Sequence, residues 1–236
     1  MKIRIKFRKW GVMKFVGHLD LMRYFQKAVN RANIDICYSE GFSPHQIMSF
    51  AAPLGVGVTS DGEYFDIEVH TSMSSKEAIA ALNQVMVDGV EVTGYVVLPE
   101  KAKTAMAIVS AADYTLSYKE GYENPYTVEQ WRGMIDEAFH KKEIFSIIKK
   151  TKKSERELDL KPLVHELKVL DSGAFFLKVS TGSTDNLKPE LVLASIFERC
   201  QVEYNPDAMQ IHRMEVYATD ETTGNFVSLL DMGEPI

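Results

Sequence analysis

Two histidines, an aspartate and a serine that could bind an anion or exchange protons lie between residues 17 and 57 of this 236-residue chain. The segment reads GHLDLMRYFQKAVNRANIDICYSEGFSPHQIMSFAAPLGVG. His18 and Asp20 stand where the apolar period of a helix begins, and Ser43 and His45 stand in a loop that can return to it. A helix N-terminus carries unpaired N–H groups and a partial positive charge. The four side chains therefore predict an anion site, with phosphate as the natural ligand.

The same residues have two other interpretations. In the plainer one, Asp20 complements the helix terminus, His18 caps the helix, and Ser43 with Pro44 forms a turn. In the other, histidine and aspartate form a metal site or an acid–base pair, which requires ligands to converge across the loop. We predict no metal site and no cofactor, because the two cysteines form no ligand motif and the chain has no complete glycine-rich phosphate loop.

Basic residues offer a second kind of chemistry, the binding of nucleic-acid phosphates. The net charge is −6, yet residues 1–36 hold nine Lys or Arg and two acids, whereas residues 61–100 hold eight acids and one lysine. Arg23, Lys27 and Arg31 fall on the polar arc of the expected helix, without a matching local acid cluster. A second basic tract contains Lys149, Lys150, Lys152 and Lys153. We predict nucleic-acid contacts at both places, although such charge runs also suit an ordinary solvated face.

The first strand carries another set of cations, Arg4, Lys6 and Arg8, which alternate with apolar residues. In the fold expected below, acids lie across the sheet from them, namely Asp66, Glu68 and Glu91. Cross-strand ion pairs would neutralise this face, so we assign the RNA contact to the helix and its loop instead. The aromatic rings of Tyr38 and Phe42 beside the loop could stack on bases or anchor the loop on the core.

Hydrophobic periodicity predicts the elements that position these residues. The first half of the chain predicts strand, helix, strand, strand, helix, strand, at residues 3–7, 18–33, 34–38, 64–69, 74–86 and 90–98. In the second half, strands are expected at 108–118, 143–149, 164–170, 175–180 and 210–218. Thr127 with Gln130 forms a capping box for one interleaved helix, and Pro189 suits the first turn of another.

This order of elements is typical of a ferredoxin-like unit, in which two helices cover one face of an antiparallel sheet. We therefore predict an α+β fold of two tandem ferredoxin-like (βαββαβ) domains with antiparallel sheets, at residues 1–100 and 107–236. The first domain carries the GHLD and GFSPH motifs and the second carries the basic tract. Since the sequence contains neither a long apolar run nor a signal peptide, we expect a cytoplasmic protein without a membrane span.

The segments GHLD, FQKAVNRA, YSEGFSPH, SFAAPLGVG and EYFDIEV together resemble the bacterial family called radical-SAM-linked proteins. Its members are fused to radical SAM proteins or encoded beside them, and their own activity is not established. Gly17 stands where a serine is usual, and Gln46 where a second proline is common. The resemblance implies a radical SAM protein as partner. The chain is not itself such an enzyme, because that cluster needs three closely spaced cysteines and this chain has two in all.

These observations favour a noncatalytic accessory module that holds a structured RNA, such as tRNA or ribosomal RNA, for a separate radical SAM enzyme. One alternative is a metal-independent ribonuclease that uses His18 and His45 as acid and base. Another is a protein-interaction scaffold that binds no RNA. RNA binding that weakens steeply with salt would favour the first interpretation, and RNA cleavage lost on histidine substitution would favour the second.

Overall fold

Alternating residues at the start of the chain form the central strand of the first half, β1 (Lys2–Lys9), whose Ile3, Ile5 and Phe7 are completely buried. The computed structural model describes residues 1–150, 155–183 and 185–236. They form a mixed α+β fold with a large, mostly antiparallel sheet and few helices. No helix in these ranges is both long enough and apolar enough to cross a membrane.

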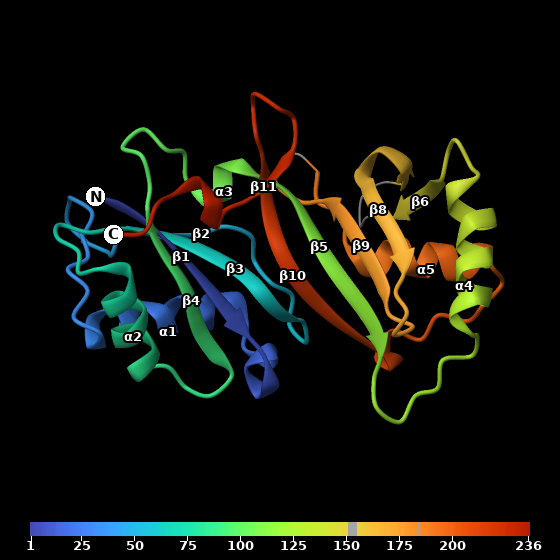
Figure 1. The fold of residues 1–236 in the computed structure, drawn as a ribbon, viewed down its shortest axis with the longest axis horizontal. Helices are drawn as coiled ribbons and strands as arrows, with labels where there is room; N and C mark the ends of the chain where they lie inside the picture. Colours follow the sequence, from blue (N-terminus) through green and yellow to red (C-terminus); the bar gives the residue numbers. More distant parts are fainter. Residues whose placement is uncertain (151–154, 184) are drawn as a thin grey trace. The chain divides into compact units, whose positions relative to one another are not determined.

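The chain divides into two compact units, of which the first contains Met1–Ala111 and Arg213–Ile236. Its strands are hydrogen-bonded in the order β4-β1-β3-β10, with β2 on β3 and β11 on β10. The remaining elements are a 3₁₀ turn η1 (Gly11–Phe15), α1 (His18–Arg31), β2 (Met48–Phe50), β3 (Thr59–Glu68), α2 (Ser75–Gln84), β4 (Val90–Val97), α3 (Ala105–Ile108), β10 (Met209–Thr219), β11 (Phe226–Ser228) and a second 3₁₀ turn η5 (Leu230–Met232). The helices α1 and α2 lie side by side near β1 and β4 (Figure 1).

One apolar core joins the helices of the first unit to its sheet. Leu21, Phe25 and Val29 of α1 pack with the buried face of β1 and with Phe50 and Phe65. The rings of Phe25 and Phe65 lie 4.7 Å apart, and those of Phe50 and Phe65 are stacked at 5.0 Å. This core fixes the position of α1 and of β2, between which the motif loop runs.

The second unit, Ala112–His212, has a core of its own. Its described elements are most of β5 (Val109–Tyr118), α4 (Val128–Ile135), a π-helical turn η2 (Asp136–His140), β6 (Ser146–Lys150), β7 (Glu155–Asp159), the 3₁₀ turn η3 (Lys161–Leu163), β8 (Val164–Val169), β9 (Phe175–Ser180), α5 (Pro189–Arg199) and the 3₁₀ turn η4 (Pro206–Ala208). The strands β5, β9 and β8 pair in that order, while β6 and β7 form a separate hairpin. Trp131 is fully buried between Phe175 and Phe197, at ring distances of 5.1 Å and 4.6 Å.

The end of the chain differs from the predicted domain of residues 107–236, because Arg213–Ile236 belongs to the first unit. Buried charges hold it there. Arg213 pairs with Glu63, and Arg4 donates a hydrogen bond to the carbonyl oxygen of Leu229 at 3.2 Å. The tail then pairs with β4 through reciprocal backbone hydrogen bonds between Val97 and Glu234.

The strand predicted at residues 34–38 is wrong in position. Ile36 makes a single bridge to Val69, and Tyr38 makes one to Gln46. The short strand that pairs with the end of β3 is instead β2. The pairing leaves no room for a longer ladder, because Met48–Phe50 already occupies the edge of β3 from Phe65 to Ile67. The tandem ferredoxin-like arrangement stays a prediction.

Candidate functional site

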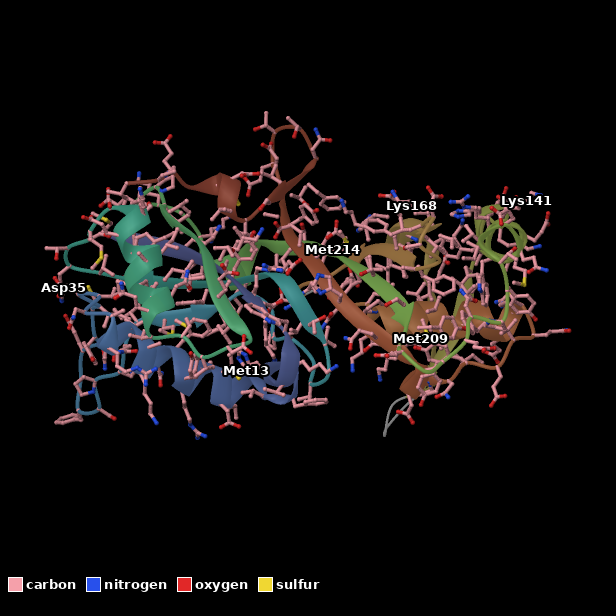
Figure 2. All side chains as sticks on the ribbon, turned by 60° about the horizontal axis from the view of Figure 1, so that its bottom comes forward. Met13, Asp35, Lys141, Lys168, Met209 and Met214 are labelled. Carbon is pink, nitrogen blue, oxygen red and sulfur yellow. The ribbon has the colours of Figure 1, made fainter. Side chains whose placement is uncertain are left out.

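The outer face of α1 carries three of the predicted phosphate-binding cations. Arg23, Lys27 and Arg31 are all exposed, while Leu21, Phe25, Ala28 and Val29 turn toward the core. Four residues advance an α-helix by about 6 Å and rotate it by only about 40° beyond one turn, so the three cations form one stripe. Figure 2 shows side chains projecting from α1 away from the sheet. We call these three residues the cationic stripe.

Asp20 lies one turn before the cationic stripe and pairs with Arg23 at 3.2 Å. The side chains of Asp20 and Arg23 are 70% and 71% exposed, so their ion pair contributes little to stability. A phosphate can therefore compete with Asp20 for the Arg23 guanidinium. Arg31 donates a hydrogen bond of 3.4 Å to the carbonyl oxygen of Val85. The cationic stripe is therefore held on α1, and the residues of that helix neutralise little of its positive charge.

His18 is the first residue of α1 and does not cap it, since the N-cap is Gly17 and no side-chain cap bond forms. Its ring meets Phe50 edge to face at 5.5 Å. Burial lowers the pKa of His18, while the nearby Glu63 carboxylate partly opposes this shift. A half-buried, neutral imidazole packed on the core is a poor phosphate ligand, so this residue contributes more to packing than to anion binding.

The motif loop is a closed hairpin-like segment, Tyr38–Gln46, which we call the finger. Ser39 N–H donates to the His45 carbonyl at 2.8 Å, and His45 N–H donates back to Ser39 Oγ at 3.1 Å. Ser39 Oγ also lies 2.8 Å from His45 Nδ1. Ser43 is exposed near the tip. The predicted Ser43 and His45 thus belong to one structured loop, although His45 bonds to Ser39 rather than to Ser43.

Gln46 fastens the finger to α1. Its Nε2 donates to the Gln26 carbonyl at 3.1 Å and to Asn30 Oδ1 at 2.7 Å. Asn30 lies between Lys27 and Arg31 along the helix. The position where a second proline is common therefore holds, in this chain, a buried side chain that ties the loop to the cationic stripe.

His18 and His45 have different partners in the structure. Among the described residues, His18 packs on Phe50 and is influenced by Glu63 and Lys9, whereas His45 bonds to Ser39. In the same part of the chain, no group of three or more His, Cys, Asp or Glu side chains could hold a metal ion. The alternative of a ribonuclease that uses His18 and His45 as acid and base stays a prediction.

The three alternating cations of β1, Arg4, Lys6 and Arg8, form ion pairs, as expected for this face, and Lys2 donates to the carbonyl of Ala102 at 3.1 Å. Arg4 is completely buried and forms two hydrogen bonds to Asp66, at 2.8 Å and 3.0 Å. Arg8 pairs with Asp61 at 2.7 Å and with Glu91 at 3.4 Å. Lys6 differs from the prediction, because its partner at 2.6 Å is Glu215 rather than Glu68. The strand therefore offers no free cationic face.

A buried charge cluster behind the motif escaped the sequence analysis. Arg213 binds Glu63 through two hydrogen bonds, of 2.7 Å and 2.5 Å, and donates a third to the Ala52 carbonyl at 2.8 Å. Lys9 is 1% exposed and donates to the carbonyl of Val16 at 2.8 Å. Burial lowers the pKa of Lys9. The cluster connects the segments on either side of α1, through Val16 and Ala52. The alternation of polar and apolar residues along a strand does not indicate that these charges are buried.

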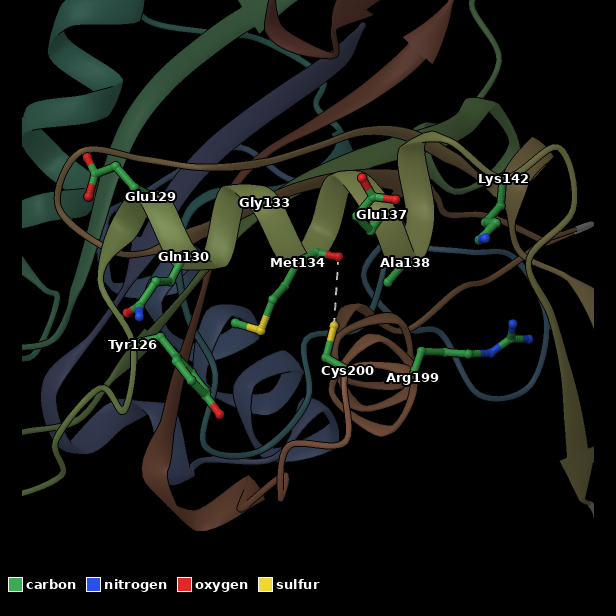
Figure 3. Close-up of a pocket in the computed structure, with 10 residues that line it drawn as sticks. All are labelled: Tyr126, Glu129, Gln130, Gly133, Met134, Glu137, Ala138, Lys142, Arg199 and Cys200. Carbon is green, nitrogen blue, oxygen red and sulfur yellow. Dashed lines mark hydrogen bonds between the residues drawn. The ribbon is translucent and has the colours of Figure 1, made fainter.

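Several cavities of the described structure have polar or charged side chains in their linings, and two of them bear on the prediction. One of 340 Å³ lies beside the finger and is lined by Ser39, His45, Gln46, Met48, Lys2 and Lys103, among others. The other, of 730 Å³, lies in the second unit between α4 and the end of α5 (Figure 3). Cys200 lines it and donates to the Met134 carbonyl at 3.9 Å. Burial raises the pKa of that thiol, so the larger cavity holds no activated nucleophile at this cysteine.

The second basic tract gives less information. The backbones of Lys149 and Lys150 belong to β6, opposite Arg156 and Glu155 of β7. Lys152 and Lys153 lie outside the described residues. The site is therefore built from the first unit alone.

Fold and site together define an α+β protein with a large antiparallel sheet, a cationic helix face and a closed loop fastened beside it. The chain belongs to a family described as uncharacterized proteins conserved in bacteria (DUF2344), whose sequence model matches residues 2–189. Among curated proteins, no sequence matches this chain. Twenty-two solved chains match its fold. One comes from the crystal structure of a Cbf5-Nop10-Gar1 complex, with a TM-score of 0.49 and 12% sequence identity; the match covers 93% of this chain and 51% of that one.

Proposed function

We propose that this protein is a noncatalytic RNA-binding module that presents a structured RNA, such as tRNA or ribosomal RNA, to a separate radical SAM enzyme. The RNA follows from charge placement, and the enzyme follows from the resemblance to radical-SAM-linked proteins. A cytoplasmic location belongs to the same proposal. We also interpret both units as ferredoxin-like, supported by the order β1, α1, β2, β3, α2, β4 in the first. In the second unit the order is β5, α4, β8, β9, α5, with the β6–β7 hairpin inserted between α4 and β8.

The observation that carries the RNA proposal is the contrast between two sets of cations in the first unit. Three cations of β1 form ion pairs, and its two others, Lys2 and Lys9, donate to backbone carbonyls. By contrast, Arg23, Lys27 and Arg31 are exposed along α1. Asp20 is the one acid in the sequence of that helix. Cations about 6 Å apart along a helix can each meet a phosphate, and the release of counterions makes such binding favourable and salt-dependent.

A salt titration tests the proposal. Fluorescence anisotropy with bulk bacterial tRNA would give the affinity of the whole protein at several salt concentrations. Arg23→Glu combined with Lys27→Glu should weaken binding and lower the slope of log affinity against log salt by about 1.5, since each lost phosphate contact contributes about 0.7–0.9. The matched control reverses two exposed lysines outside the cationic stripe, Lys101→Glu with Lys188→Glu, and should leave the slope unchanged. Absence of binding at low salt, or equal loss in both variants, would contradict the proposal.

The scaffold alternative is favoured by one observation. Val12, Phe15, Leu19 and Val56 are all 64% to 78% exposed. Gly57 N–H donates to the Lys14 carbonyl at 2.8 Å, so the backbone segments that carry Val56 and Phe15 lie side by side. Exposed apolar side chains on adjacent segments are typical of protein-binding surfaces. Val12→Ser with Leu19→Ser should then abolish retention of a co-expressed radical SAM protein, while RNA affinity stays unchanged; retention at the original level would exclude this surface as the docking site.

A further inference from the structure

The finger is a loop closed at its base by hydrogen bonds, with an aromatic residue at its tip. Phe42 is fully exposed. Hydrogen bonds between Ser39 and His45 close the base of the finger. Just outside the finger, Ile47 N–H donates to the Cys37 carbonyl at 2.9 Å. Gly41 has a φ of +106°, a backbone conformation that side chains rarely tolerate, and this glycine lets the chain turn just before Phe42.

A phenyl ring held in water by an ordered loop gives the folded chain no packing energy. The plain role considered for this residue, anchoring the loop on the core, is therefore wrong, because the ring contacts no core residue at this level of exposure. Gln46 and the Ser39–His45 bonds already anchor the loop. Because the loop is ordered in advance, a partner that packs on the ring pays little conformational entropy.

The neighbouring charge indicates which partner that is. Gln46 binds Asn30, which lies between two members of the cationic stripe, so the finger and the stripe belong to one rigid part of the first unit. Tyr38, 50% exposed, adds a second aromatic ring at the base of the finger. Aromatic rings beside a cationic track are the combination with which proteins hold single strands, the rings stacking on bases and the cations meeting phosphates.

We infer that Phe42 stacks on an unpaired nucleobase, so that the ligand is an RNA with a loop, bulge or single-stranded end rather than a continuous duplex. In a continuous helix the bases are stacked on one another and their faces are closed to a side chain. This inference rests on the proposed RNA-binding function and adds the class of RNA to it. The cationic stripe supplies affinity for either form of RNA, and the finger discriminates between them.

The test compares two labelled RNAs with the same number of phosphates, a hairpin with an unpaired loop and a blunt duplex. Phe42→Ala should weaken binding of the hairpin by about 5- to 150-fold, the range seen when one base–aromatic stack is removed. It should leave duplex affinity and the salt slope unchanged, and Phe42→Trp should retain hairpin binding. Phe15→Ala, which removes an exposed phenyl ring outside the finger, is the matched control and should change neither affinity.

The possible outcomes distinguish a failure of the stacking inference from a failure of the proposed RNA-binding function. If wild-type protein binds both RNAs and Phe42→Ala changes neither affinity, or lowers both equally, stacking on an unpaired base is refuted while RNA binding stands. If wild-type protein binds neither RNA at low salt, both the RNA function and the stacking fail, and the finger becomes a protein-binding loop. Because Phe42 lies in solvent, thermal unfolding of Phe42→Ala should match the wild type, which excludes a folding defect as the cause of any loss.

Discussion

Replacing Glu63 with alanine should strongly destabilise the first unit. Glu63 and Arg213 are 4% and 3% exposed, and two hydrogen bonds of 2.7 Å and 2.5 Å join them. The substitution leaves a buried guanidinium without its carboxylate. It also removes the negative charge that raises the pKa of Lys9, whose ammonium group is already disfavoured by burial. Two buried cations would then remain close together without the acid between them.

The expected cost is about 4 kcal/mol, since removing one partner of a buried ion pair usually costs about 3–5 kcal/mol. Asp61→Ala is the matched control, because it breaks the pair with Arg8, in which the side chains are 44% and 46% exposed. Surface pairs of this kind contribute about 0–1 kcal/mol. The double variant Glu63→Met with Arg213→Met replaces both buried charges by apolar side chains and should recover most of the lost stability.

Urea unfolding measured by tryptophan fluorescence can separate the two units. Trp10 lies in the first unit and Trp131 in the second, so a Trp131→Phe background reports on the first unit alone. The reasoning is refuted if Glu63→Ala costs no more than Asp61→Ala. It is equally refuted if the double methionine variant is as unstable as Glu63→Ala, because the penalty would then not come from an uncompensated charge.

Three further changes test other parts of the structure. Gly62→Ala should cost about 1–3 kcal/mol in thermal unfolding, because its Cβ would lie 2.6 Å from Glu215 Cα, and backbone cannot yield as a flexible side chain does. Burial lowers the pKa of His18, so the neutral ring stabilises the folded state above about pH 6.5, and this contribution is lost as the pH falls below that value. His18→Gln should therefore flatten the pH dependence of the free energy of unfolding. Identical pH profiles for the variant and the wild type would count against this prediction. Thr127→Ala should cost the second unit about 1 kcal/mol in urea, because it breaks the capping box with Gln130; a cost near zero would argue against the cap.

Much of the fold could be predicted from periodicity because its elements have one buried face. α1 begins at His18 as expected, Thr127 and Gln130 form the capping box of α4, and Pro189 is the first residue of α5. The second strand could not be found in this way. β2 has three residues, too few for an alternating pattern. Ile34 and Ile36 alternate with Asp35 because they are buried at the edge of the core, yet Ile36 forms only a single bridge, to Val69.

The site was predicted in part, and the reason lies in how charges find partners. Neighbours on a helix are three or four residues apart, so the sequence shows that Asp20, three residues before Arg23, is the one acid that α1 offers to its three exposed cations. On a sheet the neighbours depend on register, and Glu63 and Arg213 are 150 positions apart. Asp66 and Glu91 could be expected opposite Arg4 and Arg8, but Glu215 comes from a distant strand that had been assigned to another domain. Basic residues on the helix therefore remain available for phosphate, while equally basic residues on the strand serve the fold, and only the pairing of strands distinguishes the two.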